Sequence, residues 1–210
     1  FDRGDQVTEI LWFVYNLEYQ AEQHGGKVHL ILGNHEAMMF FNDKRYLAPK
    51  YKYFADYFNF TLPSLINENT ILGEWLLTKN TAIRINDILF VHAGFSPQLN
   101  ALDYSLDELN DEVRNLLKKY KVIHQSLHHK FMFGYEGPLW YRGYVVGTGW
   151  SDLVPLEELE KTLAKYQVSA IIHGHTGVRD IMQNFNGKVF NIHVPFDADD
   201  VMHKGLLITK

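Results

Sequence analysis

KVHLILGNHE, at residues 27–36, joins an apolar run to a glycine and then to an amide, an imidazole and a carboxylate side chain. An apolar run of this length predicts a buried β-strand at 27–32, and the glycine predicts a turn directly after it. The same arrangement recurs at residues 88–94 and 168–175, which read ILFVHAG and VSAIIHGH. Each of these predicted strands therefore ends in a glycine-containing loop that carries a histidine.

We expect these loops to lie close together, although they are far apart in the sequence. In open α/β sheets, sites form beyond the carboxyl ends of the strands, at one edge of the sheet. Asn34 would contribute an amide oxygen there, and His92 and His175 would contribute neutral imidazole nitrogens. Such mixed donors suit Mn, Fe or Zn better than Ca or Mg, so they predict part of a divalent metal site. A purely structural polar network at the sheet edge is the alternative.

These expected ligands carry no negative charge, and a neutral set binds a dication weakly. The missing carboxylate is Asp2, Asp5 or a residue upstream of Phe1. His173 stands two places before His175, where side-chain alternation along a strand would turn it to the opposite face. We therefore expect His173 to be either the plain end of a strand or a partner of a metal ligand.

Two arginines suit the binding of phosphate. Arg3 follows Asp2 in a predicted turn, and Arg142 lies among aromatic residues in WYRGY, at 140–144. A guanidinium presents a planar fork of donors that matches phosphate oxygens, and it stays charged at any physiological pH. Metal ligands, arginines and a histidine beside a carboxylate are together the groups that metal-assisted hydrolysis of a phosphoester requires.

Composition narrows the class of protein further. The chain has 210 residues, 46% hydrophobic and 21% charged, which excludes a disordered chain and suits an ordinary folded domain. Its 20 Lys and Arg against 25 Asp and Glu give a net charge of -5, which argues against a general nucleic-acid partner. No apolar run approaches the roughly 20 residues of a membrane span. The absence of cysteine excludes disulfides, thiolate metal sites and cysteine nucleophiles.

The remaining elements follow from residue spacing and turn residues. We expect, in chain order, a helix from about Val7 to Gly25-Gly26, helices over 37–79, a hairpin of 81–85 with 88–91, polar helix over 101–130, an irregular stretch at 131–150, a helix at 155–166, a hairpin around Asn186-Gly187 and a last strand at 206–209. This order predicts one α/β domain over 1–210, with mainly helical insertions at about 37–79 and about 101–150.

Four short motifs carry a resemblance to a known family. In chain order they are DRG at 2–4, GNHE at 33–36, HAG at 92–94 and GHT at 174–176. With them the chain resembles the metallophosphoesterase (calcineurin-like) superfamily, and within it the phosphoprotein phosphatases. DRGDQVTEILWF, GNHEAMMF, KNTAIRINDILFVHAG and GPLWYRGY are similar to the bacterial Shewanella-like protein phosphatases and cold-active protein tyrosine phosphatases. The resemblance implies a calcineurin-like β-sandwich flanked by helices, with an N-terminal strand upstream of Phe1.

The resemblance implies a binuclear centre of two divalent metal ions, which would be Mn, Fe or Zn. Asn34, His92 and His175 match the positions that bind the second ion. The family's Asp-x-His motif and its bridging Asp have no match in the chain, because Phe1 falls two places after that Asp. We therefore expect the ligands of the first ion, and the bridging ligand, upstream of Phe1.

The resemblance also implies the catalytic roles. His35, paired with Asp2, would be the general acid that protonates the leaving oxygen, and Arg3 and Arg142 would bind the phosphoryl oxygens. The implied reaction is direct hydrolysis of a phosphomonoester, in which a hydroxide that bridges the metals attacks phosphorus without a phosphoenzyme.

Two other functions stay open at this point. One is a nucleotide or dinucleotide phosphohydrolase of the same superfamily, and the other is a catalytically silent module that binds phosphopeptides. The expected partner is a phosphoprotein, with phosphorylated Ser, Thr or Tyr, or a small phosphomonoester. The sequence leaves localisation open, and a bacterial protein of this kind could be cytoplasmic or periplasmic.

Overall fold

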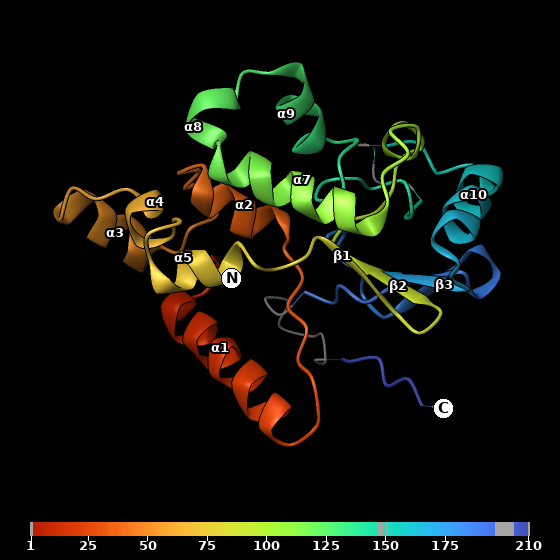
Figure 1. The fold of residues 1–210 in the computed structure, drawn as a ribbon, viewed down its shortest axis with the longest axis horizontal. Helices are drawn as coiled ribbons and strands as arrows, with labels where there is room; N and C mark the ends of the chain where they lie inside the picture. The colour runs from red at the N-terminus through yellow and green to blue at the C-terminus, as the bar shows by residue number, and fades with distance from the viewer. Residues whose placement is uncertain (1, 147–148, 150, 196–203, 210) are drawn as a thin grey trace. The chain divides into compact units, whose positions relative to one another are not determined.

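The structure is a computed structural model that describes residues 2–146, 149, 151–195 and 204–209 (Figure 1). The chain forms two compact units. The first unit comprises Phe1–Asn80 and Asp111–Gln125, and the second comprises Thr81–Asn110 and Ser126–Lys210. A division into compact units does not show whether these helical segments are insertions into one domain. The prediction of one domain with two helical insertions therefore stays a prediction.

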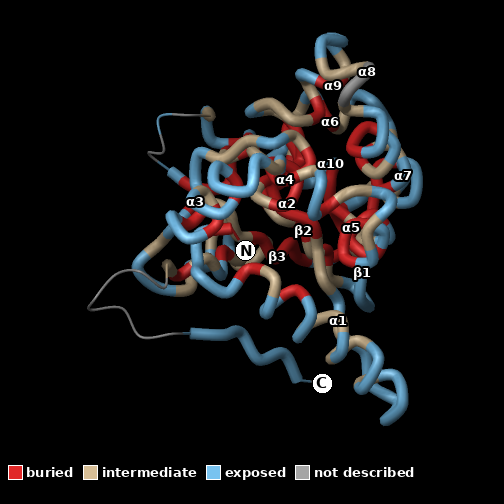
Figure 2. The backbone as a smooth tube through the Cα atoms, turned by 90° about the vertical axis from the view of Figure 1, so that its left-hand side faces the viewer, coloured by how far each residue is buried: buried red, intermediate tan, exposed pale blue. Residues whose placement is uncertain are grey.

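The first unit is helical in its described residues. Its helices are α1 (Val7–Gln23), α2 (Asn34–Phe40), α3 (Pro49–Tyr57), α4 (Leu62–Leu65), α5 (Ile71–Leu76) and α8 (Tyr120–Ile123), and α7 (Leu106–Lys118) runs into it from the second unit. The predicted first helix and the predicted helices over 37–79 are therefore confirmed. Val7 and Leu11 of α1 are buried, and α2 is buried along most of its length (Figure 2). Burial of these apolar faces, rather than helix propensity, stabilises such short helices.

The predicted strand at 27–32 is wrong. Residues 27–30 have no regular structure, and the segment makes a single bridge, between Ile31 and Asn80. The Leu32 N–H donates to the Asn80 carbonyl at 2.9 Å, but no ladder of such bonds follows among the described residues. A strand needs a neighbour along several residues, and one bridge cannot supply it. The residues that follow nevertheless form a turn into α2, as the glycine predicted.

The second unit contains a mixed sheet of five strands in the order β1-β2-β3-β5-β4. The strands are β1 (Ala82–Ile85), β2 (Ile88–Val91), β3 (Ala170–His173), β4 (Met182–Asn184) and β5 (Val189–Asn191). β2, β3 and β5 are parallel, whereas β1 and β4 pair antiparallel at the two edges. All four residues of the central strand β3 are buried, whereas its neighbours β2 and β5 alternate between buried and half-buried residues (Figure 2).

Both predicted hairpins are confirmed. β1 and β2 join at Asn86, and β4 and β5 join through a short 3₁₀ turn, η1 (Phe185–Gly187), in which Asn186 is left-handed. Asparagine tolerates this backbone conformation because its short polar side chain bonds locally. The α/β class is thus confirmed, while the second sheet of the expected β-sandwich is not formed by the residues that the structure describes.

Long irregular segments separate the helices of the second unit. These helices are α6 (Pro97–Asn100), the first part of α7, α9 (Leu127–Met132) and α10 (Leu156–Tyr166). Asn110 of α7 is buried and accepts hydrogen bonds from the N–H groups of Thr81 and Ala82, at 2.7 and 3.0 Å. Its amide donates to the Ala82 carbonyl at 2.9 Å. One side chain therefore satisfies three backbone groups where β1 begins.

The predicted last strand at 206–209 is also wrong. These residues have no regular structure, and Leu207 is 85% exposed. A run of hydrophobic residues forms a strand only where a partner edge pairs with it, and none of the described strands pairs with this one. Among the described residues, no helix combines the length and the apolar character needed to cross a bilayer.

Candidate functional site

The start of α2 positions two of the expected site residues. Gly33 is extended, with φ -108° and ψ 179°, and its N–H donates to the Glu36 carboxylate at 2.7 Å. This bond is half of a capping box, which satisfies one of the backbone N–H groups at a helix start. It fixes the turn, so that Asn34 and His35 become the first residues of α2. Asn34 is 2% exposed, whereas His35 is partly accessible.

Asp2 and His35 lie in direct contact. Oδ1 of the buried Asp2 carboxylate meets Nδ1 of the His35 imidazole. Because a carboxylate only accepts, the proton lies on Nδ1, and Nε2 becomes the outward nitrogen. Oδ2 of Asp2 is buried and has no hydrogen-bond partner among the described residues, so the carboxylate keeps one oxygen for a cation. Asp2 therefore fits both interpretations that the sequence allowed.

Arg3 completes this group of residues. Its Nη2 lies 3.5 Å from Nε2 of His35. An oxygen placed about 2.8–2.9 Å from both nitrogens, at ordinary hydrogen-bond lengths, fits over this gap. Both nitrogens donate to such an oxygen when the His35 ring carries a proton on Nε2 as well, whereas in the neutral ring Nε2 accepts from Arg3.

Tyr46 is a residue that the sequence did not single out. Its ring centroid lies 5.0 Å from that of His35, with the planes at 45°, and the Arg3 Cζ lies 5.1 Å over the same ring. No local signal distinguishes this tyrosine, because it follows His35 by eleven residues and reaches it only through the turn before α3. Asp2, Arg3, His35 and Tyr46 thus form one group of neighbouring side chains in the first unit.

In the second unit, the ends of β2 and β3 lie side by side. The strands are parallel with Phe90 opposite Ile172, and the Gly174 N–H donates to the His92 carbonyl at 2.9 Å just beyond them. The two histidine loops therefore leave the same edge of the sheet, as parallel pairing predicted. His92 Nε2 lies 3.2 Å from His175 Nδ1. We name these two residues the imidazole pair.

His175 adopts an uncommon backbone conformation in this pair. Its φ is 64°, in the left-handed region that non-glycine residues rarely occupy. The Thr176 N–H donates to the Gly174 carbonyl at 2.7 Å and closes a tight turn around it. The edge of Trp140 packs against the imidazole, with centroids 5.5 Å apart and planes at 81°. Strained residues of this kind concentrate at functional sites, where the surroundings hold them.

The imidazole pair fits a shared divalent ion. With metal–nitrogen bonds of about 2.0–2.1 Å, two nitrogens 3.2 Å apart subtend about 100–105° at the ion. This angle lies between the values of octahedral and tetrahedral coordination. The same spacing also permits a direct hydrogen bond when one ring donates, so the geometry fits an ion without requiring one. The described residues contain no group of three or more His, Cys, Asp or Glu side chains arranged for a metal.

Arg142 is held beside this pair. Its Nη1 donates to Thr176 Oγ1 at 3.2 Å and lies 3.5 Å from the His175 carbonyl oxygen. Asn191 of β5 in turn donates to the Thr176 carbonyl at 2.9 Å. Thr176 was not among the predicted site residues, although its place directly after a candidate ligand was a signal. It ties the guanidinium to the loop that carries His175.

His173 is the buried last residue of β3. Its ring packs edge-on against Tyr144, with centroids 5.2 Å apart, and burial lowers its pKa to about 4. The imidazole is therefore neutral at physiological pH. Tyr144 also approaches Gly94 so closely that a Cβ there would lie 2.7 Å from its ring, which explains the glycine of the HAG motif. His173 thus packs against Tyr144 at the end of β3, and the choice between the two interpretations of this residue stays a prediction.

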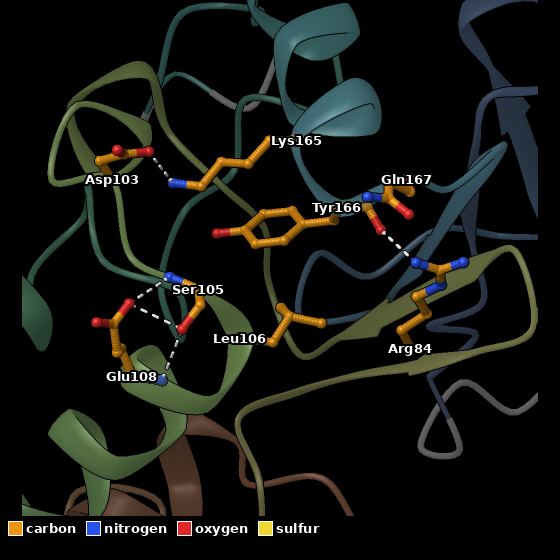
Figure 3. Close-up of a pocket in the computed structure, with 8 residues that line it drawn as sticks. All are labelled: Arg84, Asp103, Ser105, Leu106, Glu108, Lys165, Tyr166 and Gln167. Carbon is orange, nitrogen blue, oxygen red and sulfur yellow. Dashed lines mark hydrogen bonds and ion pairs between the residues drawn. The ribbon is translucent and has the colours of Figure 1, made fainter.

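A separate surface depression lies at the end of α10 in the second unit. It has a volume of about 420 Å³ and includes Arg84, Lys165 and Tyr166 in its lining (Figure 3). Figure 3 shows Lys165 turned toward Asp103 and Arg84 turned toward the backbone at Tyr166. None of the predicted site residues lines it.

The structure therefore groups the predicted residues within each unit. Asp2, Arg3, Asn34 and His35 belong to the first unit, and His92, Arg142 and His175 belong to the second. The expectation that the Asn34 amide meets both imidazoles at one ion joins residues of different units, and it stays a prediction.

Comparisons with known proteins identify the family of this chain. The sequence pattern of the calcineurin-like phosphoesterases matches residues 1–179, and the chain belongs to this family. The family generally uses a binuclear centre of divalent metal ions. The assignment to the calcineurin-like superfamily, made from four short motifs, is thereby confirmed.

Three individual proteins are similar to this chain. The structure of the cold-active protein-tyrosine phosphatase of a psychrophilic Shewanella species is similar, with a TM-score of 0.79 and 37% identity over 91% of this chain and 56% of that one. Shewanella-like protein phosphatase 1 of Plasmodium berghei is 25% identical over 84% of this chain and 49% of its own length. An uncharacterized protein of Schizosaccharomyces pombe is 31% identical over 83% and 52%. The chain spans about half the length of these proteins.

Proposed function

We propose that the chain carries catalytic machinery of a metal-dependent phosphomonoesterase, a phosphoprotein phosphatase that acts on phosphorylated Ser, Thr or Tyr. The observation that carries the proposal is the convergence of His35 Nε2 and Arg3 Nη2, 3.5 Å apart, on one oxygen position. The phosphatase names of the Shewanella and Plasmodium relatives support it.

His35 is the proposed general acid. The Asp2 carboxylate accepts from Nδ1, which orients the ring and turns Nε2 outward. In its protonated form, Nε2 donates to the oxygen that leaves phosphorus, and that oxygen departs as an alcohol or a phenol. The neighbouring Arg3 donates to a phosphoryl oxygen, and its permanent charge offsets the negative charge that develops as the bond breaks.

The second unit supplies the proposed metal ligands and a second arginine. His92 Nε2 and His175 Nδ1 would hold a divalent ion. With Asn34 of the first unit as a further proposed ligand, the mixed nitrogen and oxygen donors would suit Mn, Fe or Zn. Bound metal ions supply positive charge that polarises the phosphoryl group, and they lower the pKa of water. Arg142, held by Thr176, would donate to phosphoryl oxygens from a fixed position.

The test uses the full-length protein that contains this chain. Its metal content is measured, and turnover is compared for phosphotyrosine, phosphoserine and phosphothreonine peptides, a nitrophenyl phosphate and a panel of nucleotides. We expect phosphopeptides to be hydrolysed. A chelator should abolish this hydrolysis, and added Mn should restore it. Preferential cleavage of nucleotides would show a nucleotide phosphohydrolase instead. Binding of phosphopeptides without turnover, in protein loaded with metal, would show a silent binding module.

A further inference from the structure

Tyr46 is the side chain that supports Arg3. The guanidinium carbon of Arg3 lies 5.1 Å over the centre of the Tyr46 ring. Among the described residues, no carboxylate lies within ion-pair distance of Arg3, and its guanidinium contacts His35 and this ring. The arginine that is proposed to bind phosphate is therefore held by an aromatic face rather than by an anion.

This kind of support uses none of the N–H donors of Arg3. The N–H groups of a guanidinium point outward in its plane, whereas a cation–π contact uses the face of that plane. A carboxylate would compete with phosphate for the same N–H groups, and the Tyr46 ring does not. The ring also packs on His35, so one side chain contacts both of the converging donors.

Tyr46 is 42% exposed, and residues of its own turn contact its ring and its segment. The Arg45 guanidinium lies 5.8 Å over the same ring, and Arg45 Nε donates to both oxygens of Asp43, at 3.0 and 2.9 Å. At the end of this turn, the Ala48 N–H donates to the Asp2 carbonyl at 2.8 Å. The segment that carries the ring is thus tied to the residue that orients His35.

We propose that Tyr46 is a positioning residue that holds the Arg3 guanidinium beside His35 Nε2, with its N–H donors directed to a phosphoryl group. The inference rests on the proposed function and adds a residue to it. Tyr46 acts through Arg3, so its contribution appears as affinity for phosphate. It disappears when Arg3 is absent.

The test measures phosphate binding as well as turnover in the full-length holoenzyme. Titration calorimetry gives the Kd of inorganic phosphate, and steady-state assays give kcat and KM for a nitrophenyl phosphate. We expect Tyr46→Leu to raise the Kd and KM about two- to fivefold, the value of an exposed cation–π contact. Tyr46→Phe keeps the ring and should match the wild type. Tyr46→Gln, a second variant without a ring, should match Tyr46→Leu.

Two controls separate positioning from general damage. Tyr53→Leu removes a tyrosine of α3 that is 65% exposed and stacks on Tyr57, and it should leave the Kd unchanged. In an Arg3→Ala background, Tyr46→Leu should have no further effect on the Kd. Thermal unfolding of each variant verifies that it is folded.

The outcomes are distinct. An unchanged Kd for phosphate in Tyr46→Leu, an equal loss in Tyr46→Phe, or an undiminished effect in the Arg3→Ala background would overturn the role of Tyr46. None of these results would overturn the proposed function, because the wild type would still hydrolyse phosphomonoesters. A wild type that is loaded with metal and hydrolyses no phosphomonoester would overturn the proposed function and, with it, this inference.

Discussion

Replacement of His35 by asparagine tests the proposed chemistry most directly. Asparagine cannot carry a transferable proton, while it fills much of the same space beside Asp2. In the wild type, Asp2 holds Nδ1 and leaves Nε2 3.5 Å from Arg3 Nη2, so the imidazole is oriented for proton donation before substrate binds. The variant keeps Arg3, the imidazole pair and Arg142, and it removes only the acid.

The size of the effect follows from the leaving group. A positioned general acid contributes roughly 10²–10⁴ in rate, which corresponds to about 3–5 kcal/mol of the activation free energy. This full loss is expected for a phosphoserine peptide, because an alkoxide needs its proton. A nitrophenolate is stable as an anion and needs little protonation, so the loss should be roughly tenfold or less. Phosphotyrosine, with a phenol of pKa about 10, should fall between them.

The assay compares kcat for these three substrates in the wild type and in His35→Asn, with metal content measured in parallel. His24→Asn is the matched control, since His24 is exposed and its ring contacts only the Gln20 carbonyl in the described structure. Metal content should be unchanged in both variants. An equal loss on all three substrates would refute the general-acid assignment, because a residue that donates no proton cannot sense the leaving group.

Three further predictions concern single contacts. Thr176→Val removes the acceptor of Arg142, so KM for phosphomonoesters should rise about two- to fivefold at unchanged metal content, and an unchanged KM would exclude this support. Asn110→Ala leaves buried N–H groups at the start of β1 unpaired and should lower the free energy of unfolding by about 2–4 kcal/mol in urea titrations. Burial raises the pKa of Tyr166 to about 12, above its unfolded value of about 10, so its stabilisation is complete below pH 10 and is lost as the pH rises toward 12. At pH 11 the free energy of unfolding of the wild type should therefore have fallen by about 1 kcal/mol through this residue, whereas that of Tyr166→Phe should not show this fall. Parallel profiles of unfolding free energy against pH for the two proteins would contradict this.

Local patterns predicted most of the regular elements. The spacing of apolar residues located α1 and α10, and asparagine-containing turns located both hairpins. The errors at 27–32 and 206–209 have one physical cause. A hydrophobic run is compatible with a strand, but pairing with a neighbour makes it one, and that neighbour is not encoded in the run.

The site residues divide in the same way. Short motifs singled out Asp2, His35, His92 and His175, because a glycine turn at a strand or helix end is a local feature of the sequence. The support given by Tyr46 and Thr176 depends on segments that return to these residues through the fold. No spacing rule relates such residues to the motifs.

The amino-acid sequence by itself determined the α/β class, the family and the types of chemical group available to a phosphoryl-transfer site. Those properties follow from the composition of the chain, from the spacing of apolar residues within single elements and from short motifs. None of these depends on contacts between distant segments. Tertiary structure alone decided the contacts that no motif implied: Tyr46 under Arg3, and Thr176 holding Arg142. Such contacts depend on the paths of several segments at once, and no single stretch of the chain contains that information.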